Sequence, residues 1–502
     1  MLSSAAEEAS HAERWLSRLP TPLAIFTFAL SGVLLGISVT KGFRDPDFFW
    51  HLTTGELIAK TGQVPSVDPF SFTWAGMPWT LHEWLSELLI YWLVTGAGQL
   101  GALIVFGFVP AAIFAVMAGM LARQGVRVAA FGLPAVLIGL VVTPYVTLRP
   151  QAISWLLLAV LLWVLIELRP DRPARVLWLV PLFVLWANLH GVYVVGLGVV
   201  GVYALFTVLG RTSMSPAWRW VIVAAVGCLL ASMVTPAGPA GILYPFRYVD
   251  SGDWGLANIQ EWQSPDFHEP AHLALLGLIV AVGLNAGRNT PGWLIMLSWV
   301  GLVMSLIALR NAPIAAVFCL PTLALGLEAR LRQRPGKGAT IRPRRVGVAF
   351  GRRLIEMGAA TAVVIGSLAV LLPPVLGSQI ERSIDDRFPS AAIDLLLEAD
   401  PDARVLADYG WGGYVIHRLY ESGGRVFVDG RNDMYDQAIL EEYDAVKDAD
   451  PGWEEITDRY GVDALLLSPL TTATRGPAEA AGWCERYRDE NQVLYLRTCE
   501  DG

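Results

Sequence analysis

Long apolar runs recur along the chain from Pro22 to Pro374, and short polar segments separate them. Each run is close to the ~20 residues that a helix needs to cross a bilayer. The pattern therefore predicts a polytopic α-helical membrane protein with about eleven transmembrane helices. We expect these helices at 22–40, 100–122, 128–146, 151–168, 175–189, 192–210, 217–235, 271–287, 292–309, 312–327 and 354–374.

A shorter apolar piece, residues 83–96, precedes the second long run. Its roughly 13 residues fit an interfacial helix better than a span. Counting it as a span would also move the basic segment 328–353, with its nine Lys and Arg residues, to the outer side. The positive-inside rule opposes that arrangement. We therefore predict a cytoplasmic N-terminus and an extracytoplasmic C-terminal part.

The composition agrees with a membrane protein, because only 16% of the residues are charged and the mean hydropathy is +0.47. The net charge of −8 is unevenly divided. Residues 378–502 hold 27 acids and 12 bases, whereas the rest of the chain holds 18 acids and 25 bases. This predicts two domains: a transmembrane domain, 1–377, whose first extracytoplasmic loop is 41–99, and a soluble extracytoplasmic domain, 378–502.

The C-terminal part alternates short strand and helix patterns, which predicts a small α/β domain. RVLADYGWGGYVIHRL, GRVFVDGRNDMY, VDALLLS and QVLYLRT are typical of strands, and AAIDLLLEAD and EEYDAVKDA of helices. Asp429-Gly430-Arg431 predicts a turn with an internal ion pair, and a role in acceptor binding is the alternative. Cys484 and Cys499 could pair if this domain lies outside the cytoplasm, whereas Cys228 and Cys319 fall in apolar runs, as small core residues do.

The first outer loop gathers acids, histidines and aromatic residues. Asp45-Pro46-Asp47 predicts a helix start, with Asp45 as the cap, and Thr61-Gly62 predicts its end. In the predicted topology, polar residues at the ends of the spans collect on this outer side: Asp45, Asp47, His51, His82, Glu83, Arg149, Asn188, His190, Glu261, Asp266, Arg310 and Asn311. The first loop is thus predicted to form the floor of an active site at the extracytoplasmic surface of the membrane.

Several short motifs accompany this layout: DPDFFWHLTTG (45–55), DPFSFT (68–73), HEWL (82–85), NLHG (188–191), EWQSPDF (261–267), GGY (412–414) and VFVDGR (426–431). The chain resembles the GT-C superfamily of membrane glycosyltransferases, and within it a bacterial branch that carries these motifs. The resemblance covers most of the chain. It implies an inverting transferase that takes a sugar from a polyprenyl-phosphate donor in the bilayer and passes it to an envelope glycan, lipid or protein. It also implies that the bilayer is the cytoplasmic (inner) membrane of a bacterium.

The resemblance also implies a catalytic base in the first loop, Asp47 first and Asp45 next; a helix cap is the structural alternative for both. The predicted ligands of the donor phosphate are Arg149, Arg310 and His190, since a guanidinium suits phosphate. For the arginines the alternative is snorkelling to lipid headgroups, and for His190 a structural role in a tight turn. The expected substrate or acceptor ligands are His51, His82, Glu83, Glu261, Trp262 and Asp266, although loop structure alone explains the last three equally well.

We expect no cofactor and no nucleic-acid partner, and the sequence contains neither a P-loop nor a Rossmann fingerprint. A divalent cation held by Asp47, His51, His82 and Glu83 is a competing interpretation, although their spacing matches no known metal motif. A protein that binds, flips or scaffolds lipid-linked glycans is the main rival to an enzyme. A metal-dependent envelope hydrolase is the third hypothesis.

Overall fold

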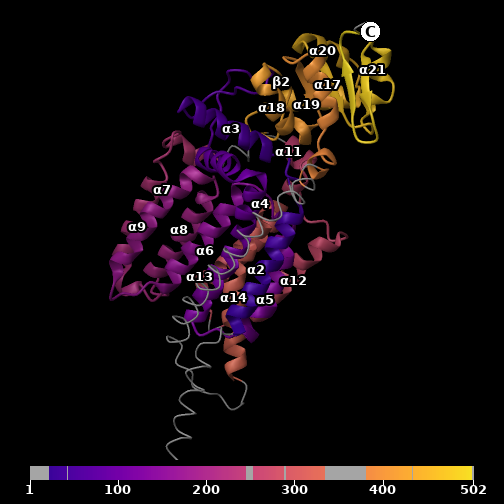
Figure 1. The fold of residues 1–502 in the computed structure, drawn as a ribbon. Helices are drawn as coiled ribbons and strands as arrows, with labels where there is room; N and C mark the ends of the chain where they lie inside the picture. The colour runs from indigo at the N-terminus through magenta and orange to yellow at the C-terminus, as the bar shows by residue number, and fades with distance from the viewer. Residues whose placement is uncertain are drawn as a thin grey trace, which may run out of the picture.

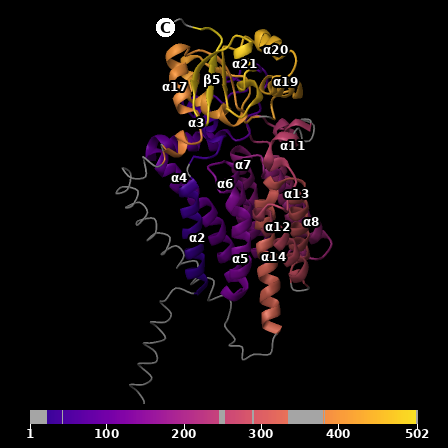
Figure 2. The same ribbon diagram turned by 90° about the vertical axis from the view of Figure 1, so that its right-hand side faces the viewer.

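The computed structural model describes residues 22–41, 43–244, 253–287, 290–333, 380, 382–431 and 433–499. A bundle of apolar helices carries an α/β domain at one end (Figures 1 and 2). The bundle is formed by α2 (Pro22–Lys41), α4 (Trp84–Arg123), α5 (Val128–Val142), α6 (Gln151–Glu167), α7 (Leu179–Leu189), α8 (Tyr193–Val208), α9 (Trp218–Ala231), α12 (Pro270–Asn285), α13 (Gly292–Ile307) and α14 (Ala312–Gln333).

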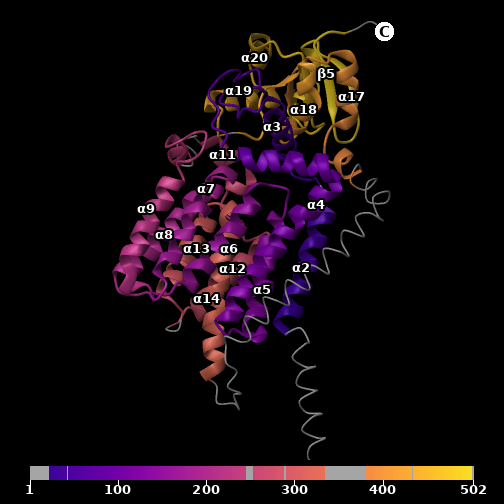
Figure 3. The same ribbon diagram turned by 60° about the vertical axis from the view of Figure 1, so that its left-hand side comes forward.

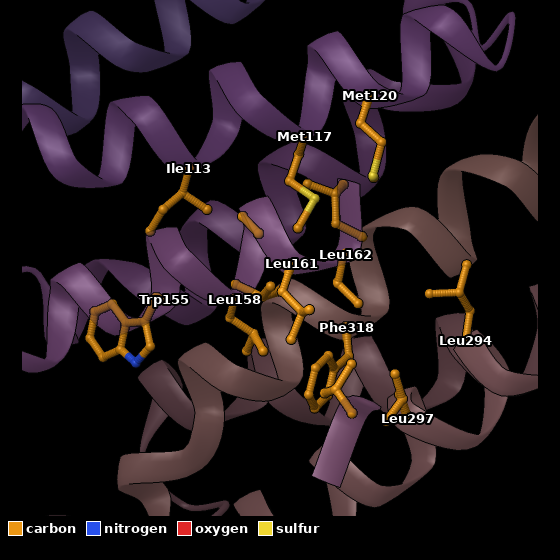
Figure 4. Close-up of a cluster of buried hydrophobic side chains, with 14 of the residues drawn as sticks. Ile113, Met117, Met120, Trp155, Leu158, Leu161, Leu162, Leu294, Leu297 and Phe318 are labelled. Carbon is orange, nitrogen blue, oxygen red and sulfur yellow. The ribbon is translucent and has the colours of Figure 1, made fainter. Parts of the chain in front are cut away.

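The described helices agree with the predicted apolar runs. Three are long and apolar enough to cross a membrane by length and composition, namely Trp84–Arg123, Val128–Tyr145 and Leu309–Gln333. Shorter apolar helical segments of 10–17 residues, such as Pro22–Ile37 within α2, make up the rest of the bundle. Each predicted span up to 312–327 contains a helix, and the predicted span 354–374 lies outside the described residues. The buried faces meet in a core to which α4, α6, α13 and α14 contribute (Figure 4).

Helix α4 joins the predicted short helix at 83–96 to the following span. It is 40 residues long, but Gly98 has non-helical angles (φ 69°, ψ 175°), so it is two helical segments separated by a kink. Figure 3 shows the first segment lying across the end of the bundle, below the α/β domain. Only glycine adopts such a positive φ with ease.

The first loop forms α3 (Phe48–Thr61), which ends at Gly62 as predicted, with Gly62 in the left-handed region. The predicted start is wrong by two residues, because the N-cap position is Asp47 and not Asp45. The carboxylate of Asp45 accepts the N–H of Asp47 at 3.0 Å. This local turn keeps residues 45–47 outside the helix.

The C-terminal domain contains a five-stranded sheet in the order β2-β1-β3-β5-β4, with β1 parallel to β2 and β3 and the other pairs antiparallel. The strands are β1 (Arg404–Ala407), β2 (Arg425–Val426), β3 (Ala464–Leu467), β4 (Cys484–Arg488) and β5 (Val493–Leu496), and the helices are α17 (Ser390–Ala399), α18 (Gly412–Leu419), α19 (Gln437–Asp448), α20 (Trp453–Tyr460) and α21 (Pro477–Ala480). The prediction that this domain belongs to the α/β class is confirmed. The disulfide between Cys484 and Cys499 forms.

One prediction in this domain is wrong: GGYVIHRL is the helix α18 and not a strand. Its Tyr, Val and Ile favour strands locally, but tertiary packing decides. A Cβ at Gly413 would lie 2.6 Å from the carbonyl oxygen of Pro46, so the start of α18 is pressed against the turn before α3.

The first loop and the C-terminal domain share one sheet edge and one core. The N–H of Val426 donates to the carbonyl of Phe70 at 3.1 Å, and the N–H of Phe72 donates to the carbonyl of Val426 at 3.0 Å. Ser71 forms a parallel bridge with Val426. Segment 70–72 thus continues the sheet beyond β2, and a single apolar cluster includes α3, this segment and the strands.

Candidate active site

Arg149 lies between three carboxylates brought together from distant parts of the chain. Its Nε is 2.5 Å from Asp45 Oδ2, its Nη2 is 3.0 Å from Asp47 Oδ2, and its Nη1 is 2.8 Å from Glu261 Oε2. The two aspartates precede α3, Arg149 precedes α6, and Glu261 lies in the short helix η4 (Gln260–Trp262). The predicted outer-side cluster therefore exists for these four residues.

The two cavity-facing carboxylates of this cluster differ in their electrostatics. Burial raises the pKa of Asp47 to about 7, because desolvation outweighs the attraction of Arg149, and the charges of Asp45 and Glu261 raise it further. Burial also acts to raise the pKa of Glu261, but Arg149 and Arg310 together hold it below its usual value. Of these two, Asp47 is thus the carboxyl group that can change protonation near neutral pH.

A second polar group lies at the start of α4, where Glu83 is 3.5 Å from His82 Nε2 and 3.8 Å from His190 Nε2. Burial raises the pKa of Glu83 to about 8, with a further rise from the charges of Asp433 and Asp47. Burial lowers the pKa of His82 to about 4 and that of His190 well below its usual range. Both rings are therefore neutral at physiological pH.

The hydrogen bonds of His190 fix its tautomer. Its Nδ1 is 3.2 Å from the N–H of Val192, which donates to it, and 3.2 Å from Ser154 Oγ. Because Trp186 donates its indole N–H to Ser154 at 2.8 Å, the serine hydroxyl is free to donate to the histidine. The ring proton then resides on Nε2, which faces Glu83.

His51 turns away from the acids of its own loop and contacts α4. Its Nδ1 lies 3.2 Å from Oε1 of Glu87, a fully buried carboxyl group. The sequence analysis did not single out Glu87, because an acid inside an apolar run gives no indication of which residue it meets. The pair joins α3 to α4 beneath the cavity.

Arg310 and Trp262 form the opposite wall. The guanidinium lies over the indole ring, 4.5 Å from its centroid, and the N–H of Leu309 donates to the carbonyl of Gln263 at 3.0 Å, which joins η4 to η5 (Leu309–Asn311). Asp266, however, is not part of this group. Its side chain is 61% exposed and pairs with the fully exposed His268 at 2.8 Å.

These residues surround a cavity of about 500 Å³ at the junction of the bundle and the C-terminal domain. Of the predicted site residues, the cavity lining contains Asp47, His51, His82, Glu83, Arg149, His190, Glu261, Trp262 and Arg310. Asp45 lies behind the wall and is 2% exposed. The C-terminal domain adds Gly430 and Arg431 of the predicted turn to the lining, together with three residues that the sequence analysis missed: Arg387, Tyr409 and Asp433.

The close approach of the C-terminal domain to the first loop requires a glycine at position 430. A Cβ there would lie 2.0 Å from Oδ1 of Asp47. Next to it, Arg431 pairs with Asp429 at 2.6 Å and with Asp68 of the first loop at 2.8 Å, all three being buried. The predicted ion pair inside the turn is confirmed, and it extends across the two domains.

The part of the chain that the structure describes contains no group of three or more His, Cys, Asp or Glu side chains placed to hold a metal ion. The three carboxylates around Arg149 converge on its guanidinium. A divalent cation at that position would have to displace the arginine.

The fold and the cavity define a helical membrane protein that carries a C-terminal α/β domain and a polar site where the two parts meet. No protein-family model matches the sequence, and no curated protein matches it. Solved structures do resemble it. One is the archaeal oligosaccharyltransferase AglB from Archaeoglobus fulgidus in complex with an inhibitory peptide and a dolichol-phosphate, with a TM-score of 0.56 and 12% identity over 95% of this chain and 74% of that one.

The A. fulgidus oligosaccharyltransferase tethered to an acceptor peptide with the NVT sequon gives a TM-score of 0.53 at 12% identity, over 94% of this chain and 74% of that one. The apo form of the same enzyme gives a TM-score of 0.51 at 12% identity, over 95% of this chain and 75% of that one. This similarity shows the fold: over nearly its whole length the chain has the fold of these oligosaccharyltransferase structures.

Proposed function

We propose that this protein is a membrane glycosyltransferase that moves a sugar from a polyprenyl-phosphate donor to an envelope glycan, lipid or protein on the extracytoplasmic side. The observation that carries the proposal is the cavity between bundle and C-terminal domain, which combines an arginine, a neutral histidine and several carboxyl groups. The GT-C fold supports it, and a neighbour with that fold binds a dolichol-phosphate.

The proposed topology has about eleven spans, with the domain boundary near residue 377 and the C-terminal domain outside the cytoplasm of a bacterial cell. The basic segment 328–353 favours this orientation. The disulfide between Cys484 and Cys499 supports it independently, because disulfides persist in oxidising compartments.

In the proposed complex, Arg310 binds the donor phosphate, and the Nε2–H of His190 donates to it. Positive charge and hydrogen-bond donors at this position stabilise the phosphate that leaves with the electron pair of the broken bond. For Arg149 we propose a different role from the one that the sequence predicts. Its three carboxylate partners use its donors, so we assign it to holding Asp45, Asp47 and Glu261 in place.

Transfer with inversion requires the acceptor hydroxyl to attack the anomeric carbon from the face opposite the phosphate. A carboxylate in the cavity then takes the hydroxyl proton. Within the first loop Asp47 fits this role better than Asp45, since Asp47 lines the cavity and Asp45 is buried behind it. Trp262 offers a ring face on which a sugar can stack.

Binding of undecaprenyl phosphate to the purified protein, measured by native mass spectrometry with undecaprenol for comparison, tests the donor site. We expect the phosphate to bind and Arg310→Gln to weaken binding about 10- to 100-fold, the value of a charge-assisted contact. Arg219→Gln is the matched control, because Arg219 also lies over a tryptophan but on α9, away from the cavity. Equal binding of undecaprenol would contradict the proposal.

Sugar transfer is then measured with a panel of polyprenyl-phosphate-linked hexoses, pentoses and amino sugars, with extracted envelope material as acceptor. The rival hypothesis, a protein that flips or scaffolds lipid-linked glycans, predicts binding without transfer. Release of free polyprenyl phosphate together with labelled acceptor distinguishes the two.

A further inference from the structure

The C-terminal domain places a carboxyl group, that of Asp433, in the cavity wall. Nothing in the first-loop motif indicates it, because 386 positions separate it from Asp47 in the sequence. The segment before it is held firmly: Gly430 lies against Asp47, and Arg431 is bound on both sides by buried aspartates. The position of Asp433 relative to the first loop is therefore defined by packing.

The contacts of Asp433 differ from those of the other acids. Both oxygens of Asp47 have donors, with Arg149 at 3.0 Å from Oδ2 and the indole N–H of Trp50 at 3.3 Å from Oδ1. Oδ2 of Asp433 is buried and has no hydrogen-bond partner among the described residues. A buried carboxyl oxygen without a hydrogen-bond partner is unfavourable, and a bound hydroxyl group would supply the missing donor.

The electrostatic surroundings suit a base that works near neutral pH. Burial raises the pKa of Asp433 to about 7; its own backbone N–H lowers it somewhat, and the charge of Asp47 adds to the rise. A general base is most effective when its pKa is close to the working pH. The other titratable or charged groups facing this cavity are Asp47, His51, His82, Glu83, Arg149, His190, Glu261, Arg310, Arg387, Tyr409 and Arg431.

We propose that Asp433 is the general base of the transfer reaction and that its Oδ2 binds the hydroxyl group of the acceptor. The acceptor oxygen forms a bond to the anomeric carbon while the bond from that carbon to the phosphate oxygen breaks. The hydroxyl proton passes to Oδ2 of Asp433, and the electron pair of the broken bond leaves with the phosphate. Asp433 then releases the proton to solvent.

This assignment rests on the proposed function and revises one part of it. Asp47 remains paired with Arg149 and Trp50, and these contacts assign it to positioning the first loop rather than to proton transfer. The C-terminal domain thus supplies a catalytic residue, and the cavity is complete only when that domain is docked.

The test compares Asp433→Asn with Asp436→Asn, an exposed aspartate three residues further on. With the polyprenyl-phosphate sugar that the wild type uses, we expect Asp433→Asn to lower kcat about 10²- to 10⁴-fold, with KM for the donor changed less than threefold. Asp436→Asn should match the wild type. Asp433→Glu should recover part of kcat, which a purely structural role would not predict.

The pH profile gives a second readout. Since the base acts in its deprotonated form, kcat/KM of the wild type should fall about tenfold per pH unit below pH ~7, and Asp433→Asn should lose this limb. If Asp433→Asn has a kcat within threefold of the wild type and still shows the fall of kcat/KM at acidic pH, Asp433 is not the base. The proposed glycosyltransferase function would remain. Absence of transfer by the wild type with every donor overturns both. If Asp433→Asn does not fold, the same criteria apply to Asp433→Ser.

Discussion

The buried ion pairs of Arg431 give the sharpest test of how the first loop and the C-terminal domain are joined. Its guanidinium donates from Nη1 to Asp68 at 2.8 Å and from Nε and Nη2 to Asp429 at 2.7 and 2.6 Å. Arg431 is 1% exposed and both carboxylates are 0% exposed. The cation also lies over the rings of Phe70 and Trp79, 5.0 and 4.7 Å from their centroids.

Arg431→Ala should destabilise the joined unit by about 3–5 kcal/mol, because it leaves two buried carboxylates without their cation. Loss of the two cation–π contacts adds to this cost. For a cooperative unit of about 150–250 residues, this corresponds to a melting temperature lower by about 6–20 °C. The melting temperature of Arg431→Lys should lie between those of the wild type and Arg431→Ala, since one ammonium group cannot reproduce the forked contacts to both acids.

The assay is thermal unfolding in detergent together with hydrogen exchange of residues 68–79. The matched control is Arg459→Ala, which removes an ion pair with Glu442 on the exposed surface of the same domain and should cost less than about 1 kcal/mol. Changing Asp68 and Asp429 to Asn in the Arg431→Ala background should recover part of the loss. If Arg431→Ala melts no lower than Arg459→Ala, the two parts are not held together by this cluster.

Three further changes test other contacts made by the C-terminal domain. Gly430→Ala should displace the Asp47 carboxylate by about 1 Å and lower the rate of sugar transfer on the order of 100-fold. Gly410→Ala, whose added Cβ would meet open space, should leave the rate unchanged. Equal rates for the two variants would contradict the close approach of Gly430 to Asp47. Phe72→Pro removes the N–H that donates to β2, so limited proteolysis should cut the first loop faster than in the wild type, and unchanged cleavage would argue against the added strand. Cys484→Ser opens a disulfide that spans 15 residues and should cost about 3 kcal/mol in thermal unfolding; a melting curve unaffected by both this change and reductant would count against the bond.

The sequence predicts those features that depend on local pattern. Apolar run lengths give the bundle helices, Gly62 gives the end of α3, and the short run at 83–96 gives the first segment of α4. The predicted topology also places the acids and Arg149 on the same side of the membrane, which is why the sequence predicts that they lie close together. The same reasoning places Asp266 there, but position along the membrane normal does not fix lateral position, and Asp266 lies outside the cavity.

What the sequence does not predict depends on contacts between distant segments. The start of α3 is set by a side-chain turn at Asp45, and the helix α18 is set by packing of Gly413 on Pro46. Glu87 and Asp433 are isolated acids in the sequence, and only the fold shows that one meets His51 and the other faces the cavity. Neither could be found without knowing which surfaces meet.

The charge balance of the cavity explains why such a site would need carboxyl groups with raised pKa values. An anionic donor would be repelled by a set of ionised acids next to Arg310. Asp47, Glu83 and Asp433 have pKa values of about 7, 8 and 7, so they are largely or partly protonated at neutral pH. Binding of a phosphate should raise these values further by like-charge repulsion. A base in this cavity then works only if one carboxyl group loses its proton while the phosphate stays bound, and departure of the phosphate would lower its pKa again. Proton release and product release are therefore expected to be coupled in the proposed reaction.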